Sequence, residues 1–206
     1  ANKYDIMKNW EADLSVDYKW NYLNSTLADF AYPNRHTTLV ALASAYTYQR
    51  FKAQASVLYT MVNDRATARS AGEVMARHSA WKHEFTPAVF FSYQPMEERD
   101  FFLRAFYKRI FRMPTFNDLY YLQIGNTSLR PENANEYGLG MTWNSRRWGM
   151  LKYVTLTVDG YYNNVTDKIV AFPSTYVWKM VNFGKVEAKG LDATIGTELD
   201  LALIHI

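Results

Sequence analysis

The side chains that could carry out catalysis or bind a metal are few and scattered. The 206-residue chain has four histidines and no cysteine, so thiolate metal sites, disulfides and thiol nucleophiles are excluded. Neither the His-Glu-x-x-His pattern of zinc proteases nor the Gly-x-Ser-x-Gly turn of serine hydrolases occurs. His78 and His83 share one segment, but histidines without carboxylate support are more often solvated than metal-bound. The sequence therefore predicts no catalytic residue, no metal site and no cofactor.

The remaining charged side chains alternate with apolar ones. From Trp10 to Trp20 every even position is apolar or aromatic, and the odd positions between them are polar or charged. This pattern predicts a β-strand with one apolar face and one charged face. Ten residues at about 3.3 Å each, tilted by about 45°, rise roughly 23 Å. That rise fits the apolar band, about 25 Å tall, of an outer-membrane barrel with aromatic residues at both edges.

The same alternation recurs and predicts about eight strands, over residues 10–20, 38–48, 51–61, 85–93, 101–107, 137–143, 154–162 and 191–199. One face is expected to meet lipid, and it carries Trp10, Tyr18, Trp20, Tyr59, Phe91, Tyr107, Trp143 and Val158. The opposite, inward face carries Asp13, Asp17, Arg104, Lys108 and Asp159. Such groups more often solvate the interior of a large barrel than line a ligand path.

Short and long connections alternate between the expected strands. The short ones cover 48–50, 94–99 and 145–149, and the long ones cover 21–37, 63–83, 111–135 and 167–185. Within the second long connection, residues 66–77 are expected to form a short helix. In an up-and-down sheet this order puts all long loops at one end, as in outer-membrane barrels with short periplasmic turns and long outer loops.

Composition agrees with a barrel and excludes other classes. Aromatic residues make up 17% of the chain and mean hydropathy is −0.31, without any run of about 18 apolar residues that would form a membrane-spanning helix. The net charge of +3 is spread along the chain, so no nucleic-acid partner is expected. No linker interrupts residues 1–206, which we expect to be a single domain and an internal part of a longer protein.

Three segments carry a more specific pattern. The first is Phe111–Tyr121, which reads FRMPTFNDLYY; the second is Gly125–Ala134, which reads GNTSLRPENA; and the third is Asn182–Asp192, which reads NFGKVEAKGLD. Together they resemble the C-terminal half of TonB-dependent outer-membrane receptors. The likeness is strongest from about residue 100 to residue 199.

The resemblance implies an all-β fold, an antiparallel up-and-down transmembrane β-barrel of which this chain supplies about eight strands. It implies a place in the outer membrane of Gram-negative bacteria, with lipid around the barrel. It also implies TonB-dependent import of a scarce ligand of the siderophore, haem, cobalamin or glycan class. The chain would supply barrel wall and extracellular loops, and TonB would act through a plug domain that these 206 residues lack.

The resemblance also suggests roles for particular residues. A loop needs fixed turns and caps, so most motif residues are expected to be structural: Arg112, Pro114, Asn117, Asp118, Gly125, Asn126, Pro131 and Glu132. Arg112 and Asp118 are expected to pair. Exposed loop aromatics often bind ligands, and the candidates for ligand contact are Tyr120, Tyr121, Tyr176 and Trp178.

Two other classes compete with the receptor. A complete, small eight-stranded barrel would act as an adhesin or structural protein, but the terminal aromatic residue usual in such barrels is missing at Ile206. An outer-membrane protease or acyltransferase would need a His/Asp/Ser constellation, and the sequence shows none. The receptor interpretation is therefore preferred, and the chain is not expected to be an enzyme.

Overall fold

The computed structural model describes residues 2–27, 30–70, 73–97, 100–121, 124–148 and 151–199. Within these ranges the chain forms nine strands and one short helix. In chain order they are β1 Asn2–Met7, β2 Trp10–Tyr22, β3 Asn34–Tyr48, β4 Phe51–Ser70, β5 Glu73–Tyr93, β6 Asp100–Arg112, α1 Phe116–Tyr120, β7 Glu132–Trp148, β8 Leu151–Pro173 and β9 Trp178–Leu199.

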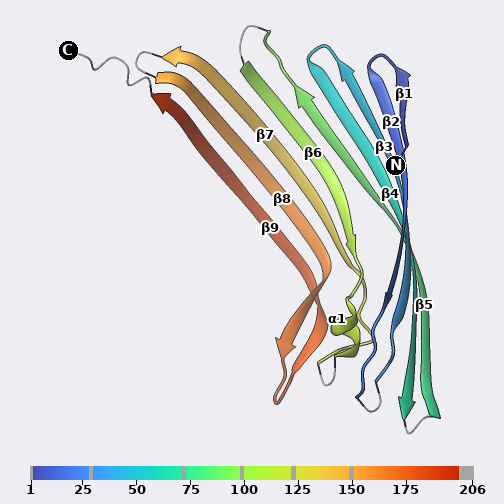
Figure 1. Cartoon of the computed structure of the whole chain (residues 1–206). Helices are drawn as coiled ribbons and strands as arrows, with labels where there is room; N and C mark the ends of the chain where they lie inside the picture. The colour runs from blue at the N-terminus through green and yellow to red at the C-terminus, as the bar shows by residue number, and fades with distance from the viewer. Residues whose placement is uncertain are drawn as a thin grey trace.

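The strands form one antiparallel sheet in which each strand pairs with its neighbours in sequence, from β1 to β9 (Figure 1). The prediction of an all-β, up-and-down sheet is therefore confirmed. The sequence missed β1, because its six residues are too few to show a clear alternation. Among the described residues, α1 is far too short to cross a membrane and no other helix is present.

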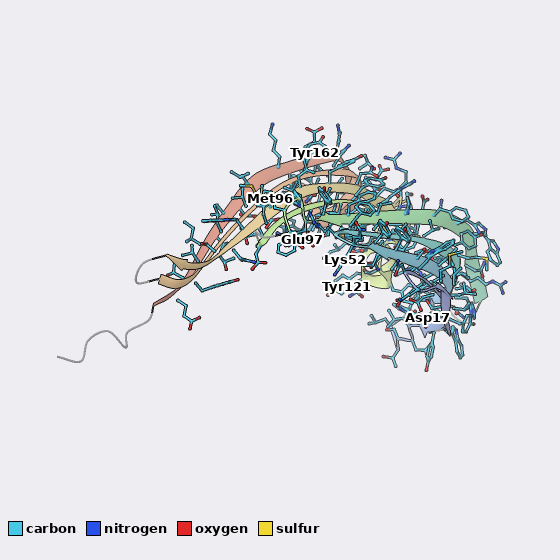
Figure 2. The ribbon with its side chains drawn as sticks, turned by 90° about the horizontal axis from the view of Figure 1, so that it is seen from above. Asp17, Lys52, Met96, Glu97, Tyr121 and Tyr162 are labelled. Carbon is cyan, nitrogen blue, oxygen red and sulfur yellow. The ribbon has the colours of Figure 1, made fainter. Side chains whose placement is uncertain are left out.

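The sheet curves strongly, so that it has a concave and a convex side (Figure 2). In the described residues β1 and β9 lie at opposite edges of the sheet and are not paired with each other. The chain therefore forms an open section of barrel wall, and the alternative of a closed eight-stranded barrel does not describe this sheet.

The strand register places the predicted lipid-facing residues on one face. Leu14, Leu42, Val57 and Pro87 form one row across β2 to β5. Two aromatic belts flank this apolar band, one near Trp20 and Trp81 and the other at Trp10, Tyr46, Phe51 and Tyr93. Most of these large side chains are exposed in the chain by itself. A surface of this kind matches a membrane-facing wall with aromatic girdles at both edges.

The opposite face carries the charges that the sequence analysis placed inward. The register puts Asp13, Asp17, Arg104, Lys108 and Asp159 on this face. Arg104 Nη2 lies 3.0 Å from Asp159 Oδ1, and Lys108 Nζ lies 2.8 Å from Glu136 Oε2. The loop that contains α1 also lies on this concave side (Figure 2), so the charged face is the interior of the wall.

One end of the sheet has only short connections, and the other end carries the two long ones, between β2 and β3 and, with α1, between β6 and β7 (Figure 1). The prediction of long loops is wrong for two of the four segments, 63–83 and 167–185. Instead of a loop with a helix at 66–77, β4 and β5 stay paired as far as Ser70 and Glu73. Likewise β8 and β9 continue to Pro173 and Trp178. Cross-strand pairing overrides the weak helical preference of an alanine-containing segment.

The ladder between β5 and β6 is short. It runs only from Ala88–Lys108 to Tyr93–Leu103, and the two strands separate beyond it. Pro87, the next residue of β5, has no N–H to donate to a neighbouring strand. The separated ends are joined by an ion pair of 2.5 Å between Arg109 Nη2 and Glu84 Oε1.

The face assignment makes a measurable prediction at Val158, which lies in a row with Met141 and Ala193 on the outward face. Val158→Arg should lower the free energy of unfolding in lipid by about 2–4 kcal/mol, because it places a charge in the apolar band. Denaturant unfolding of the full-length protein in lipid vesicles measures the change. The control is Thr157→Arg, on the concave face; equal losses for both variants would contradict the assignment.

Candidate ligand site formed by the long loops

The loop between β6 and β7 contains the first sequence motif and begins with a capped helix. The side chain of Thr115 accepts a hydrogen bond from the Asp118 amide (3.2 Å), and the Asp118 carboxylate accepts one from the Thr115 amide (2.8 Å). This reciprocal arrangement is a capping box, which satisfies backbone donors that a helix start leaves unpaired. Pro114 is fully buried just before the cap. The Pro-Thr-x-x-Asp spacing thus fixes where α1 begins.

Gly125 lets the loop fold back onto α1. Its amide donates to the Tyr121 carbonyl at 2.7 Å, and the next amide, of Asn126, donates to the Asp118 carbonyl at 2.8 Å. A Cβ atom added at Gly125 would lie 2.7 Å from both the Leu119 carbonyl oxygen and the Tyr121 nitrogen. Backbone atoms cannot move aside as a flexible side chain can, so this position requires glycine.

The second and third motifs meet each other, although they lie about 50 residues apart. The Asn182 side chain accepts from the Arg130 amide (2.8 Å) and donates to the Arg130 carbonyl (2.9 Å). Asn126 Nδ2 donates to the Met180 carbonyl at 3.0 Å, and the Met180 amide donates to the Ile124 carbonyl at 2.9 Å. These bonds attach the loop to β9.

An irregularity in the β8–β9 ladder also helps to hold the β6–β7 loop against β9. Asp167 and Gly184 both have positive φ, 55° and 31°, and the regular pairing is interrupted between Thr166–Lys185 and Lys168–Phe183. The Asp167 carbonyl there accepts from Asn182 Nδ2 at 2.8 Å. Its carboxylate pairs with Arg130 Nη2 at 2.5 Å. The glycine of the third motif thus accommodates a left-handed backbone beside the loop anchor.

Glu132 joins the loop to β6 and β8. It is buried, and its carboxylate accepts from Arg112 Nη2 (2.9 Å), Lys168 Nζ (2.9 Å) and the Ile169 amide (3.2 Å). Arg112 Nη1 also lies 3.7 Å from Asp118 Oδ2, the pairing expected from the sequence. Burial by itself raises the pKa of Glu132, but the three donors outweigh it and hold the pKa below its ordinary value.

A further anchor, between Arg35 and Asp64, was not predicted. Arg35 Nε and Nη2 each donate to the Asp64 carboxylate at 2.6 Å, and both side chains are largely buried. Arg35 Nη1 donates to the Pro114 carbonyl at 2.8 Å, and the guanidinium lies 5.1 Å from the centre of the Phe116 ring. The sequence analysis placed both residues in long connections, at 21–37 and 63–83, and only the longer strands of the structure bring them opposite each other.

The docked loop forms one side of a pocket of about 690 Å³ at the end of the sheet that carries the long connections. All four residues proposed for ligand contact line it. Tyr120 and Tyr121 come from α1 and the residue after it, and Tyr176 and Trp178 come from the β8–β9 turn and the first position of β9. The loop between β2 and β3 contributes Leu23, Asn24, Ser25, Leu27 and Phe30. Asn117, expected to be structural, lines it as well. Figure 2 shows Tyr121 on the concave side of the sheet.

The four aromatic residues differ in exposure. Tyr176 is 94% exposed, Tyr121 59% and Trp178 54%. Tyr120 is half-buried and packs against the cluster of Leu119, Leu129 and Ile169. Burial first, and then the Asp64 carboxylate, raise the pKa of Tyr120. The Tyr120 hydroxyl therefore stays protonated and can donate a hydrogen bond.

A second hollow of about 670 Å³ lies on the wall, lined by Phe90, Arg104, Phe106 and Tyr161 among others. Phe106 lies flat on Gly138, where an added Cβ would come within 2.2 Å of the ring. Arg104 and Asp159 lie over Gly140 in the same way. Loops contribute nothing to this hollow, so we regard the loop pocket as the candidate ligand site.

The histidines lie elsewhere. On the outward face, His36 Nδ1 shares a hydrogen bond of 2.6 Å with the Tyr18 hydroxyl, and His83 Nδ1 shares one of 2.7 Å with the Tyr59 hydroxyl. The side chain of His78, and all of His205, lie outside the described residues. Within the described part of the chain, no group of three or more His, Asp or Glu side chains is arranged to hold a metal ion.

Comparison with known proteins matches residues 3–204 to the family described as TonB dependent receptor-like, beta-barrel. The vitamin B12 transporter BtuB of Photobacterium profundum is 28% identical over 91 residues, which cover 42% of this chain and 14% of that protein. The chain thus spans about one seventh of that relative's length.

Solved structures with a similar fold include the copper transporter OprC, with a TM-score of 0.76 at 12% identity, covering 95% of this chain and 33% of that one. The FrpB iron transporter from Neisseria meningitidis (F3-3 variant) gives a TM-score of 0.69 at 12% identity, covering 96% of this chain and 32% of that one. At these identities the likeness concerns the fold, and the chain spans about a third of each structure.

The close contact at Gly125 predicts that Gly125→Ala loosens the loop. The added methyl group clashes with two backbone atoms, so we expect a cost of about 1–3 kcal/mol. Hydrogen exchange at the Asn126 and Met180 amides of the full-length protein measures it. The control is Gly160→Ala, whose Cβ would have no neighbour nearer than 3.8 Å. Unchanged exchange in Gly125→Ala would contradict the packing described here.

The lowered pKa of Glu132 predicts a pH dependence. Because the folded-state pKa lies below the ordinary value of 4.5, the stabilisation is complete above pH 4.5 and is lost as pH falls through the lowered pKa. Glu132→Gln should remove this dependence and, at neutral pH, destabilise the docked loop by about 1.5–3 kcal/mol. Hydrogen exchange at the Ile169 amide measures both effects. Glu136→Gln, which disrupts the ion pair with Lys108 on the wall, is the matched control.

Proposed function

We propose that this chain forms wall and outer loops of a receptor that imports a scarce ligand. The basis is that the chain belongs to the TonB-dependent receptor-like β-barrel family of the Gram-negative outer membrane. Energy would come from TonB, acting through a plug domain in another part of the parent protein. The relatives are named as transporters of vitamin B12, copper and iron, which supports transport rather than catalysis for this chain.

The observation that carries the proposal is the pocket that three connections, β2–β3, β6–β7 and β8–β9, share at one end of the sheet. Tyr120, Tyr121, Tyr176 and Trp178 line one cavity, although the sequence separates the two pairs by more than 50 residues. Large ligands are commonly held by apolar and aromatic surfaces with a few placed polar groups. The lining residues Asn24, Ser25 and Asn117 provide amide and hydroxyl groups for that purpose.

The chemistry of the lining suggests how a ligand is held. None of the thirteen described lining residues is charged, so recognition by this part of the receptor would rest on aromatic faces and hydrogen bonds. Exposed tyrosine and tryptophan rings stack on flat or ring-shaped ligand surfaces, and their polar atoms still reach hydrogen-bond partners. Ligands of the siderophore, haem, cobalamin and glycan classes all present such surfaces, and we propose these four classes as candidates.

The anchored loop supports the same role. Arg35, Glu132 and Asn182 hold the loop between β6 and β7 against β3, β6, β8 and β9. A site held in place by rigid strands loses less conformational freedom when it binds, which favours affinity. Movement that admits the ligand would then fall to the plug, and the charged concave wall, including Arg104 and Asp159, is where we propose that the plug packs.

The proposal predicts a loss of uptake when the exposed aromatic residues are removed. In the full-length receptor, Tyr121→Ala with Tyr176→Ala should weaken ligand binding by about 2 kcal/mol or more, roughly 30-fold. Tyr120→Phe tests the Tyr120 hydroxyl without disturbing its packing. Ligand uptake and binding by whole cells provide the measurement, with the natural ligand identified from uptake in the presence and absence of TonB.

The control is Tyr48→Ala, a similarly exposed tyrosine at the other end of the sheet, which should leave affinity unchanged. Unchanged affinity in Tyr121→Ala with Tyr176→Ala would remove these residues from the site. Uptake that continues without TonB would instead contradict the transport mechanism itself.

A further inference from the structure

The outward face near the long loops carries the same side-chain arrangement twice. On β2 and β3, the Tyr18 hydroxyl lies 2.6 Å from His36 Nδ1, and the Trp20 ring lies parallel to the imidazole at 6.1 Å. On β4 and β5, the Tyr59 hydroxyl lies 2.7 Å from His83 Nδ1, and the Trp81 ring lies nearly parallel to that imidazole at 6.2 Å. We call these two clusters and the residues between them the loop-side rim.

The strand register joins the two clusters into one surface. Trp20, His36, Asn63 and Trp81 form a single row across β2 to β5. The adjoining row, nearer the loops, contains Tyr22, Asn34 and Arg65. Trp20 Nε1 donates to Asn34 Oδ1 at 2.8 Å, which connects the two rows. Arg65 is exposed and, among the described residues, forms no ion pair with another side chain.

One buried donor in this surface has no partner. Asn63 is only 4% exposed, and its Nδ2 has no hydrogen-bond acceptor in the described part of the chain. It lies in its row between His36 and Trp81. A buried donor without an acceptor costs roughly 1–3 kcal/mol. This atom lies beneath the surface of the rim, so a bound molecule would meet it only after the side chains over it shift.

The opposite rim of the same strands lacks these features. Its outward rows contain Trp10, Tyr46, Phe51, Phe91 and Tyr93, which are aromatic without histidine or free arginine. Arg50, in the turn at that end, is paired with Glu97. A simple aromatic girdle would be alike at both edges of the membrane. The additional donors therefore mark the loop side, where the outer leaflet meets water.

We propose that the loop-side rim binds the phosphorylated headgroup of an outer-leaflet lipid. The Arg65 guanidinium supplies a fixed positive charge, and basic pockets on membrane proteins hold lipid headgroups in this way. In the tautomer whose Nδ1 accepts the tyrosine hydrogen bond, the ring proton lies on Nε2, and in that form His36 and His83 each offer a donor there. The exposed rings of Trp20 and Trp81 pack against the apolar part of the lipid.

The site rests on the outer-membrane location and on the geometry of the rim, and it is independent of the ligand that the loop pocket takes. The test uses the full-length receptor in detergent and measures binding of lipid A with its phosphates, of the same lipid after dephosphorylation, and of inorganic phosphate. The wild-type protein should bind the phosphorylated lipid at least about tenfold more tightly than the dephosphorylated one.

His36→Ala combined with His83→Ala should abolish this preference. Because these residues pack against tryptophans, Arg65→Glu at an exposed position provides a second variant that keeps the fold, and it should abolish the preference as well. Tyr46→Ala with Tyr48→Ala, at the opposite rim, is the matched control and should retain it.

Three results would overturn the proposal. Equal binding of the two lipids by the wild-type protein would reduce the loop-side rim to an ordinary aromatic girdle. Retention of the preference in Arg65→Glu would remove the charged contact on which the site depends. Competition by inorganic phosphate at the concentration at which lipid A saturates would assign the site to a free anion instead of a lipid.

Discussion

The structure depends on one constraint, the need of every backbone N–H and C=O group in a membrane wall to find its partner on the neighbouring strand. Lipid offers no hydrogen bonds, so a wall of this kind is built from continuous ladders. Eight ladders in sequence order join the nine described strands here, and the outer edges of β1 and β9 have no partner strand among the described residues. Where a ladder ends early, as between β5 and β6 beyond Ala88, a side-chain ion pair between Arg109 and Glu84 takes over the connection.

Alternation along the paired strands gives each side of the wall its own chemistry. Successive side chains of a strand point to opposite faces, so one stretch such as Trp10–Tyr22 provides both the apolar exterior and the charges Asp13 and Asp17 of the interior. The two faces therefore meet different surroundings without any change of fold. Ion pairs such as Arg104–Asp159 stay on the concave side, and tyrosine and tryptophan rings form belts on the convex one.

At the loop end, polar side-chain contacts hold the chain in place of the ladders. Three anchors hold the loop between β6 and β7 against the wall: Arg35 with Asp64, Glu132 with its three donors, and Asn182 with Arg130. Asp64 and Glu132 are buried, so truncating their partners leaves a buried carboxylate unpaired, which costs more than the contact contributes. The same anchors place Tyr120 and Tyr121 beside Tyr176 and Trp178, so the stability of the loop and the shape of the candidate site are linked.

The sequence by itself determined the local features: strands with two unlike faces, and the long connections at 21–37 and 111–135 that lie at one end of the sheet. Each follows from neighbours a few residues apart, which is the range over which alternation acts. Only the tertiary structure decided which segments pair, and pairing turned two expected loops, at 63–83 and 167–185, into extended hairpins. It also added β1 and joined Arg35 to Asp64, 29 residues away. Such contacts carry no local signal, because a partner on the next strand satisfies a residue wherever it lies in the chain.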